Sequence, residues 1–136
     1  MVKVIMGLKG SGKTKILVSL VKTAVEEENG SVICIEKDKN LTYDIPYTAR
    51  LINAVDYNIS SYEFMRGFIS GLYAGNYDIT HIFIDNFFKI IGDSSNERMA
   101  EFLDWLEAFS QRQNVKFTIS ATADPDQAGD AIRKYF

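Results

Sequence analysis

The residues best suited to chemistry lie near the beginning of the chain, where glycines, a lysine and a threonine follow a fixed spacing. The stretch has the form G-x-x-x-x-G-K-[ST], and its members are Gly7, Leu8, Lys9, Gly10, Ser11, Gly12, Lys13 and Thr14. Glycines allow the tight turns and close backbone approach that direct several N–H groups at one anion. A lysine at this position reaches phosphate oxygens, and the hydroxyl after it can ligate Mg²⁺. The spacing therefore predicts a loop that binds phosphate groups.

The flanking sequence supplies the structural context that such a loop needs. An apolar run over residues 2–6 predicts a strand before the loop, and an apolar stripe over residues 16–25 predicts a helix that begins near Lys13. A chance match in a glycine-containing turn is the alternative. On these residues the chain resembles the P-loop NTPase superfamily, and the resemblance implies a nucleoside triphosphate bound with Mg²⁺.

Asp85 is a candidate metal ligand because it ends the apolar run Thr80–Ile84. This form is similar to the Walker B aspartate of the superfamily. The resemblance implies that Asp85 holds Mg²⁺, usually through a water molecule, opposite the Thr14 hydroxyl. The alternative is that Asp85 only caps the turn that follows.

Glu36 is a candidate catalytic carboxylate because it ends the apolar run Ser31–Ile35. Asn86 follows Asp85, where many ATPases of the additional-strand division have a glutamate that activates water. The branch that resembles RecA, hexameric helicases and KaiC instead has its glutamate at the end of the second strand, which matches Glu36. The resemblance implies catalytic roles for Lys13 and Glu36, whereas a solvated glutamate at a strand exit is the alternative.

Further polar residues have weaker signals. The segment 117–122 resembles the strand in which RecA-like cores keep a polar group near the γ-phosphate, which makes Ser120 and Thr122 candidates. Hydroxyls at strand ends also commonly bond local backbone groups. An arginine that stabilises transferred phosphate can come from the chain itself or from a neighbouring subunit. Three arginines are candidates, and nothing in the sequence selects among Arg98, Arg112 and Arg133.

The nucleotide is expected to be ATP rather than GTP. The N-K-x-D element with which GTPases read the base is absent. A D-x-x-G match at residues 126–129 follows the wrong strand to be a GTPase motif.

The whole chain predicts one α/β domain over residues 1–136. Apolar runs of strand type alternate with helical stripes, which favours parallel strands joined by right-handed crossovers. The expected fold is a three-layer α/β/α sandwich with a mostly parallel sheet, as in the P-loop NTPase fold. Further strands are expected at 80–85 and 116–122, and a short strand or one helical turn at 50–55. Helices are expected over about 60–73, after Ser94, and from Asp124 to the end.

Composition excludes several functional classes. The net charge is −3 and the pI is about 5.1, which argues against a free-standing nucleic-acid binder. Cys34 is the single cysteine, so neither a disulfide framework nor a zinc cluster is expected. No apolar run approaches the length of a membrane helix, and the N-terminus has no signal-peptide pattern, so we expect a cytoplasmic location.

Three functional hypotheses remain open at this stage. The first is a Mg²⁺-dependent ATP-binding protein of RecA-like type that hydrolyses ATP. The second is a small-molecule kinase of the thymidine-kinase kind, which has a similar core. The chain, however, has neither the cysteines for that family's zinc-bearing domain nor an evident arginine-rich lid. The third is a regulatory or assembly module that binds ATP without turnover, which Asn86 favours. A protein partner or a homo-oligomer is compatible with all three hypotheses.

Overall fold

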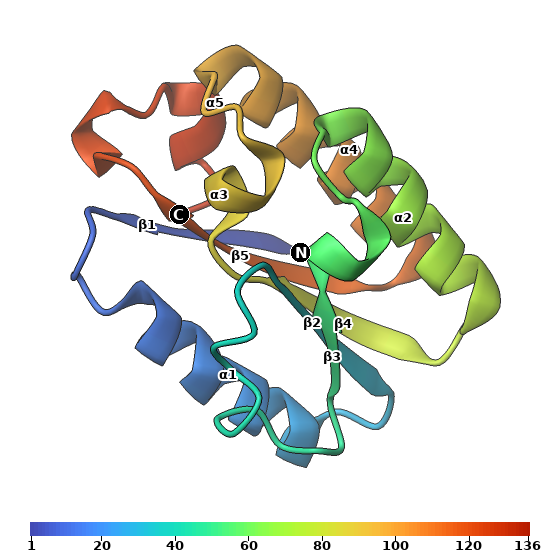
Figure 1. Ribbon diagram of the computed structural model, residues 1–136. Helices are drawn as coiled ribbons and strands as arrows, with labels where there is room; N and C mark the ends of the chain where they lie inside the picture. Colours follow the sequence, from blue (N-terminus) through green and yellow to red (C-terminus); the bar gives the residue numbers. More distant parts are fainter.

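The computed structural model describes residues 1–136 and has the α/β architecture that the sequence predicts (Figure 1). The strands are β1 (Val2–Gly7), β2 (Ser31–Glu36), β3 (Arg50–Asn53), β4 (Ile79–Ile84) and β5 (Lys116–Thr122). The helices are α1 (Lys13–Glu27), α2 (Tyr62–Gly75), α3 (Phe87–Ile91), α4 (Asn96–Gln113) and α5 (Asp130–Arg133). Two 3₁₀ turns complete the chain, η1 (Ala54–Tyr57) and η2 (Pro125–Gln127).

The five strands form one sheet in the order β1-β5-β4-β2-β3, and every pair is parallel. The register places Gly7 opposite Thr122 and Ile35 opposite Ile84. Because the strands are parallel, their carboxyl ends meet at one edge of the sheet. The residues that follow β1, β2, β4 and β5 are therefore brought together, although they are far apart in the sequence.

Helices cover both faces of the sheet, which confirms the predicted three-layer sandwich. Helix α1 lies on one face, whereas α2, α3, α4 and α5 lie on the other (Figure 1). The core under α2 and α4 is the larger, with 27 buried residues against 9 under α1. Three buried residues of the segment between β2 and β3 complete the smaller core beside α1: Leu41, Ile45 and Ala49. The loop between β2 and β3 therefore covers part of this face of the sheet beside α1.

Three local predictions were wrong. The chain after Asp124 forms η2 and the four-residue helix α5 rather than one continuous helix, because Ala128 and Gly129 adopt extended conformations between them. Ser60 and Ser94, each with a glutamate three positions later, predict capping boxes, but the N-caps of α2 and α4 are Ser61 and Ser95, each one residue later.

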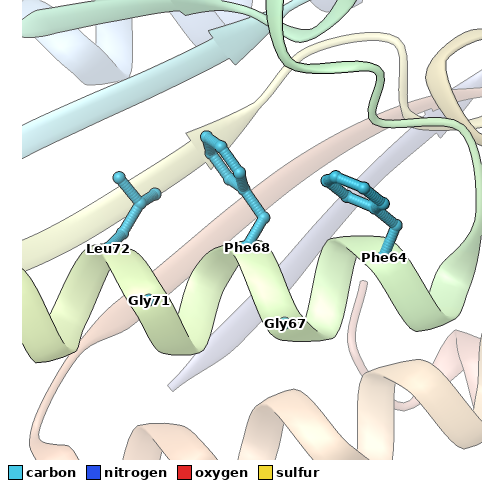
Figure 2. A pocket seen from close by; sticks show the side chains of 5 residues that line it. All are labelled: Phe64, Gly67, Phe68, Gly71 and Leu72. Atoms are coloured by element: carbon cyan, nitrogen blue, oxygen red, sulfur yellow. The ribbon is translucent and has the colours of Figure 1, made fainter.

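Helical spacing predicts an inner stripe on α2 that is made of Phe64, Phe68, Ile69 and Leu72, but the helix exposes part of this stripe. Phe64 is 46% exposed, whereas Tyr62, Met65 and Ile69 supply the buried face. Phe64, Phe68 and Leu72 point to the same side of the helix and line an open apolar groove, with Gly67 and Gly71 between them (Figure 2). The groove has no charged residue in its lining, so it does not suit a phosphate group.

His81 is a buried residue that makes two hydrogen bonds. Its Nδ1 lies 2.8 Å from Glu28 Oε2, and its Nε2 lies 2.8 Å from Thr118 Oγ1. The ring also stacks on Phe83. Glu28 ends the acidic run 26–28, which the sequence alone predicts to be solvated, but its side chain is largely buried against His81 and also pairs with Lys116. These contacts join the end of α1 to the central strands.

The buried imidazole predicts that stability depends on pH. Burial lowers the pKa of His81 below its ordinary value of 6.5, although the Glu28 carboxylate partly opposes the shift. The unfolded chain therefore binds the proton more readily than the folded chain. The free energy of unfolding should therefore be independent of this group above pH 6.5. It should decrease at lower pH, by at most about 1.4 kcal/mol per pH unit.

Urea unfolding of wild type and of His81→Gln between pH 5 and pH 7.5 tests this pH dependence. His81 is the only histidine, so the difference between the two curves reports the imidazole together with its effect on the neighbouring Glu28 carboxylate. Parallel curves would contradict the expectation.

Candidate nucleotide-binding site

The glycine-rich loop, residues 7–14, joins the end of β1 to the start of α1. Gly10 and Gly12 have φ values of +83° and +84°, a left-handed conformation that glycine adopts without strain. At Gly7 the constraint is space, because an added Cβ would lie 2.4 Å from Ser11 Oγ. No side chain caps the N-terminus of α1. The first N–H groups of the helix are thus left available to an anion, and the helix dipole favours one there.

Lys13 is the first residue of α1, and its side chain turns back toward the loop. Its side chain is not directed into solvent, since the residue is only 8% exposed. Nζ donates hydrogen bonds to Leu8 O at 2.9 Å and to Ser11 Oγ at 3.4 Å. The ammonium group therefore lies within the curve of the loop. There it can replace its hydrogen bonds to a carbonyl and a hydroxyl with hydrogen bonds to phosphate oxygens while it moves only a short distance.

Thr14 and Asp85 face each other across the carboxyl edge of the sheet. Thr14 Oγ1 lies 3.2 Å from Asp85 Oδ1 and 3.3 Å from Oδ2. The Asp85 backbone N–H donates to Ile35 O at 2.9 Å, so the ladder between β4 and β2 fixes the position of the carboxylate. The sequence separates these two residues by 71 positions.

The Thr14 and Asp85 oxygens suit Mg²⁺. This cation prefers oxygen ligands at about 2.0–2.1 Å in octahedral geometry, so two neighbouring ligands lie about 3 Å apart. The observed separations of 3.2 and 3.3 Å are close to that value. Asp85 is 8% exposed and therefore retains only a small opening to solvent. Thr14 and Asp85 are the residues that would hold the ion, directly or through water.

A polar cavity of about 380 Å³ opens beside these groups. No hydrophobic residue lines it, and its lining consists of Lys9, Gly10, Gly12, Lys13, Thr14, Lys15, Asn86, Ser120 and Thr122. Three lysines with no carboxylate in the lining give the cavity a positive field, which attracts an anion such as a triphosphate.

Asn86, Ser120 and Thr122 form the side of the cavity opposite the loop. Asn86 has φ 55° and ψ 56°, a left-handed conformation that asparagine adopts more readily than most residues. Ser120 Oγ accepts from Asn86 N at 2.7 Å, and Thr122 Oγ1 donates to Asn86 Oδ1 at 3.4 Å. From the sequence, Asn86 stood out only as a departure from a family pattern. The signal that could have placed Asn86 in the site is the residue type, since asparagine adopts the left-handed conformation of a turn more readily than most residues.

Glu36 lies near Asp85, but its carboxylate is engaged by the backbone. Oε1 accepts from Asn40 N at 2.8 Å and Oε2 from Leu41 N at 3.2 Å. The residue is 3% exposed and does not line the polar cavity. Burial raises the pKa of Glu36; the two backbone hydrogen bonds partly oppose this shift, and the Asp85 charge adds to it. In this arrangement Glu36 anchors the loop after β2, and its catalytic role stays a prediction.

None of the three candidate arginines lines the polar cavity. Arg98 pairs with Glu63 and Asp93. Arg133 donates to Pro125 O at 2.8 Å, and Arg112 lies over the ring of Phe109. Each therefore already has a partner on the face of the sheet that α4 covers.

No protein-family model matches this chain, and a search of curated proteins gives no match either. None of the helices combines the length and apolar character that a membrane crossing requires.

Proposed function

We propose that the chain is a Mg²⁺-dependent ATP-binding protein of RecA-like type that hydrolyses ATP. The observation that carries the proposal is the contact of Thr14, which follows Lys13 on a glycine-rich loop, with Asp85, which follows β4 and lies 71 positions later in the sequence. A nucleoside triphosphate with Mg²⁺ needs a positively charged side chain in the loop, hard oxygen ligands for the metal and a positive polar cavity, and the chain has these parts.

The strand order supports the RecA-like, additional-strand branch of the P-loop NTPase fold. Strand β5 lies between β1, which leads into the glycine-rich loop, and β4, which leads into Asp85. Its carboxyl end contributes the Ser120 and Thr122 hydroxyls to the cavity. This is the position expected for the polar strand of such cores.

The residues have separate roles in this proposal. The loop N–H groups and Lys13 bind the phosphate oxygens and orient the γ-phosphoryl group. Thr14 and Asp85 hold Mg²⁺, which supplies charge neutralisation at the transferring phosphate. Glu36 orients the attacking water, and to do so its carboxylate must leave the Asn40 and Leu41 N–H groups.

Binding without turnover is the second candidate, and two observations favour it. Both oxygens of Glu36 accept backbone hydrogen bonds, and the residue after Asp85 is an amide rather than a carboxylate. No carboxylate lines the cavity. Turnover by the isolated chain should be slow.

Calorimetric titration of ATP and of GTP, each with and without Mg²⁺, followed by phosphate release over hours, tests the proposal. We expect ATP to bind more tightly than GTP, and binding to tighten with Mg²⁺. Phosphate release above the protein-free control supports hydrolysis, whereas binding without release supports the second candidate. Failure of both nucleotides to bind would overturn the proposed function.

A further inference from the structure

Ser120 is a buried hydroxyl that contacts both Asp85 and the residue after it. The residue is 1% exposed and lies on β5, next to β4 in the sheet. Its Oγ donates to Asp85 Oδ1 at 2.7 Å and accepts from Asn86 N at 2.7 Å. One side chain thus bridges a carboxylate and the backbone N–H that follows it.

The bridge constrains the rotation of the Asp85 carboxylate. Oδ1 accepts from Ser120 at 2.7 Å, whereas both oxygens lie at the longer distances of 3.2 and 3.3 Å from Thr14. A hydrogen bond to a charged acceptor is roughly twice as strong as one between neutral groups. The bonds from Ser120 and Thr14 both have this charged acceptor, so the shorter bond, from Ser120, has the larger part in fixing the plane of the carboxylate, and Oδ2 keeps Thr14 as its hydrogen-bond partner.

The same hydroxyl also supports the turn at Asn86. A left-handed backbone conformation is strained for residues other than glycine unless their surroundings stabilise it. The Asn86 N–H finds its acceptor in Ser120, and the Asn86 carbonyl accepts from Lys89 N at 3.0 Å to begin α3. Ser120 therefore holds the Asp85 carboxylate and the Asn86 turn in one fixed relation.

We propose that Ser120 is a positioning residue for the metal site, acting through Asp85 rather than through contact with the nucleotide. This inference rests on the proposed function and assigns Ser120 a different task from the γ-phosphate contact that the sequence suggested. Residues behind a metal ligand typically change metal affinity 10- to 100-fold when they are replaced. The affected quantity should be the contribution of Mg²⁺ to ATP binding, because the hydrogen bonds of Ser120 Oγ go to Asp85 and Asn86 and none goes to the loop that holds the phosphates.

The test measures the ATP dissociation constant in EDTA and in excess Mg²⁺. The quantity compared among variants is the Mg²⁺ ratio, which is the constant in EDTA divided by the constant in Mg²⁺. In Ser120→Ala the ratio should fall about tenfold, while the constant in EDTA stays within about twofold of wild type. Ser120→Thr keeps the hydroxyl and should retain the wild-type ratio.

Thr118→Val is the matched control. Thr118 lies on the same face of β5, is 2% exposed, and bonds His81 rather than Asp85. Its replacement removes a buried hydroxyl from the same strand and should lower the thermal midpoint, yet leave the Mg²⁺ ratio unchanged. An equal fall of the ratio in Thr118→Val would overturn the proposal, because general loosening of β5 would then explain both results.

The remaining outcomes also decide the question. An unchanged ratio in a cooperatively unfolding Ser120→Ala protein overturns the proposal. If Ser120→Ala does not fold, Ser120→Cys takes its place, since a thiol is a similar shape but a weak donor. A wild-type ratio in Ser120→Cys would overturn the proposal in the same way. Absence of ATP binding by wild type is a separate result, which rejects the proposed function itself.

Discussion

Lys13→Ala is expected to weaken ATP binding at least about 100-fold while the fold remains intact. The Lys13 ammonium lies inside the curve of the loop, where it bonds Leu8 O and Ser11 Oγ. Hydrogen bonds to charged groups are worth about 1.5–3 kcal/mol each, and 1.4 kcal/mol corresponds to a factor of ten in affinity. Two such bonds to phosphate therefore account for the expected loss. Calorimetric titration with Mg²⁺-ATP measures it, and thermal unfolding monitors the fold.

Lys22→Ala is the matched control for Lys13→Ala. Lys22 lies on the same helix, is exposed, and makes no ion pair. Its replacement removes the same charge and leaves the same residue behind. Affinity should change less than about threefold, since exposed charges at a distance are largely screened. Wild-type affinity in Lys13→Ala, or an equal loss in both variants, would contradict the assignment of the loop.

The centre of the sheet could be predicted from the sequence because β2, β4 and β5 are buried on both faces. Parallel strands of this kind are continuous apolar runs, and those at 31–35 and 80–84 correspond to β2 and β4. The order of the strands could not be predicted, since it depends on which helix crosses which face. The exposure of Phe64 was missed for a similar reason. Several apolar stripes are available on α2, and packing against α4 and the sheet selects the one that contains Met65 and Ile69.

The candidate site was predictable where it depends on topology. Parallel strands bring their carboxyl ends to one edge, so the approach of Asp85 to Thr14 followed from the strand assignments. The hydrogen bonds between the Glu36 carboxylate and the backbone were not predictable, because they depend on a turn. Lys39 has φ 54°, and this left-handed residue turns the chain so that the next two N–H groups meet the Glu36 carboxylate. Lysine gives little sequence signal for that conformation.

Glu36→Gln is expected to keep ATP binding within about threefold of wild type and to slow phosphate release about 100-fold. A positioned general base contributes 10²- to 10⁴-fold to such reactions, and glutamine cannot accept the proton from water. Binding should persist because Glu36 does not line the polar cavity. Phosphate release at saturating Mg²⁺-ATP measures the rate, and a parallel titration measures the affinity.

Asp38→Asn is the matched control for Glu36→Gln, because it removes a carboxylate from the same loop. Asp38 pairs with Lys89 at the surface, and its replacement should leave the rate of phosphate release unchanged within about twofold. If Glu36→Gln releases phosphate at the wild-type rate, Glu36 serves only to hold the Asn40 and Leu41 N–H groups, and another group activates the water. If both variants slow release equally, the loop after β2 acts through its conformation, and the Glu36 carboxylate is not the base.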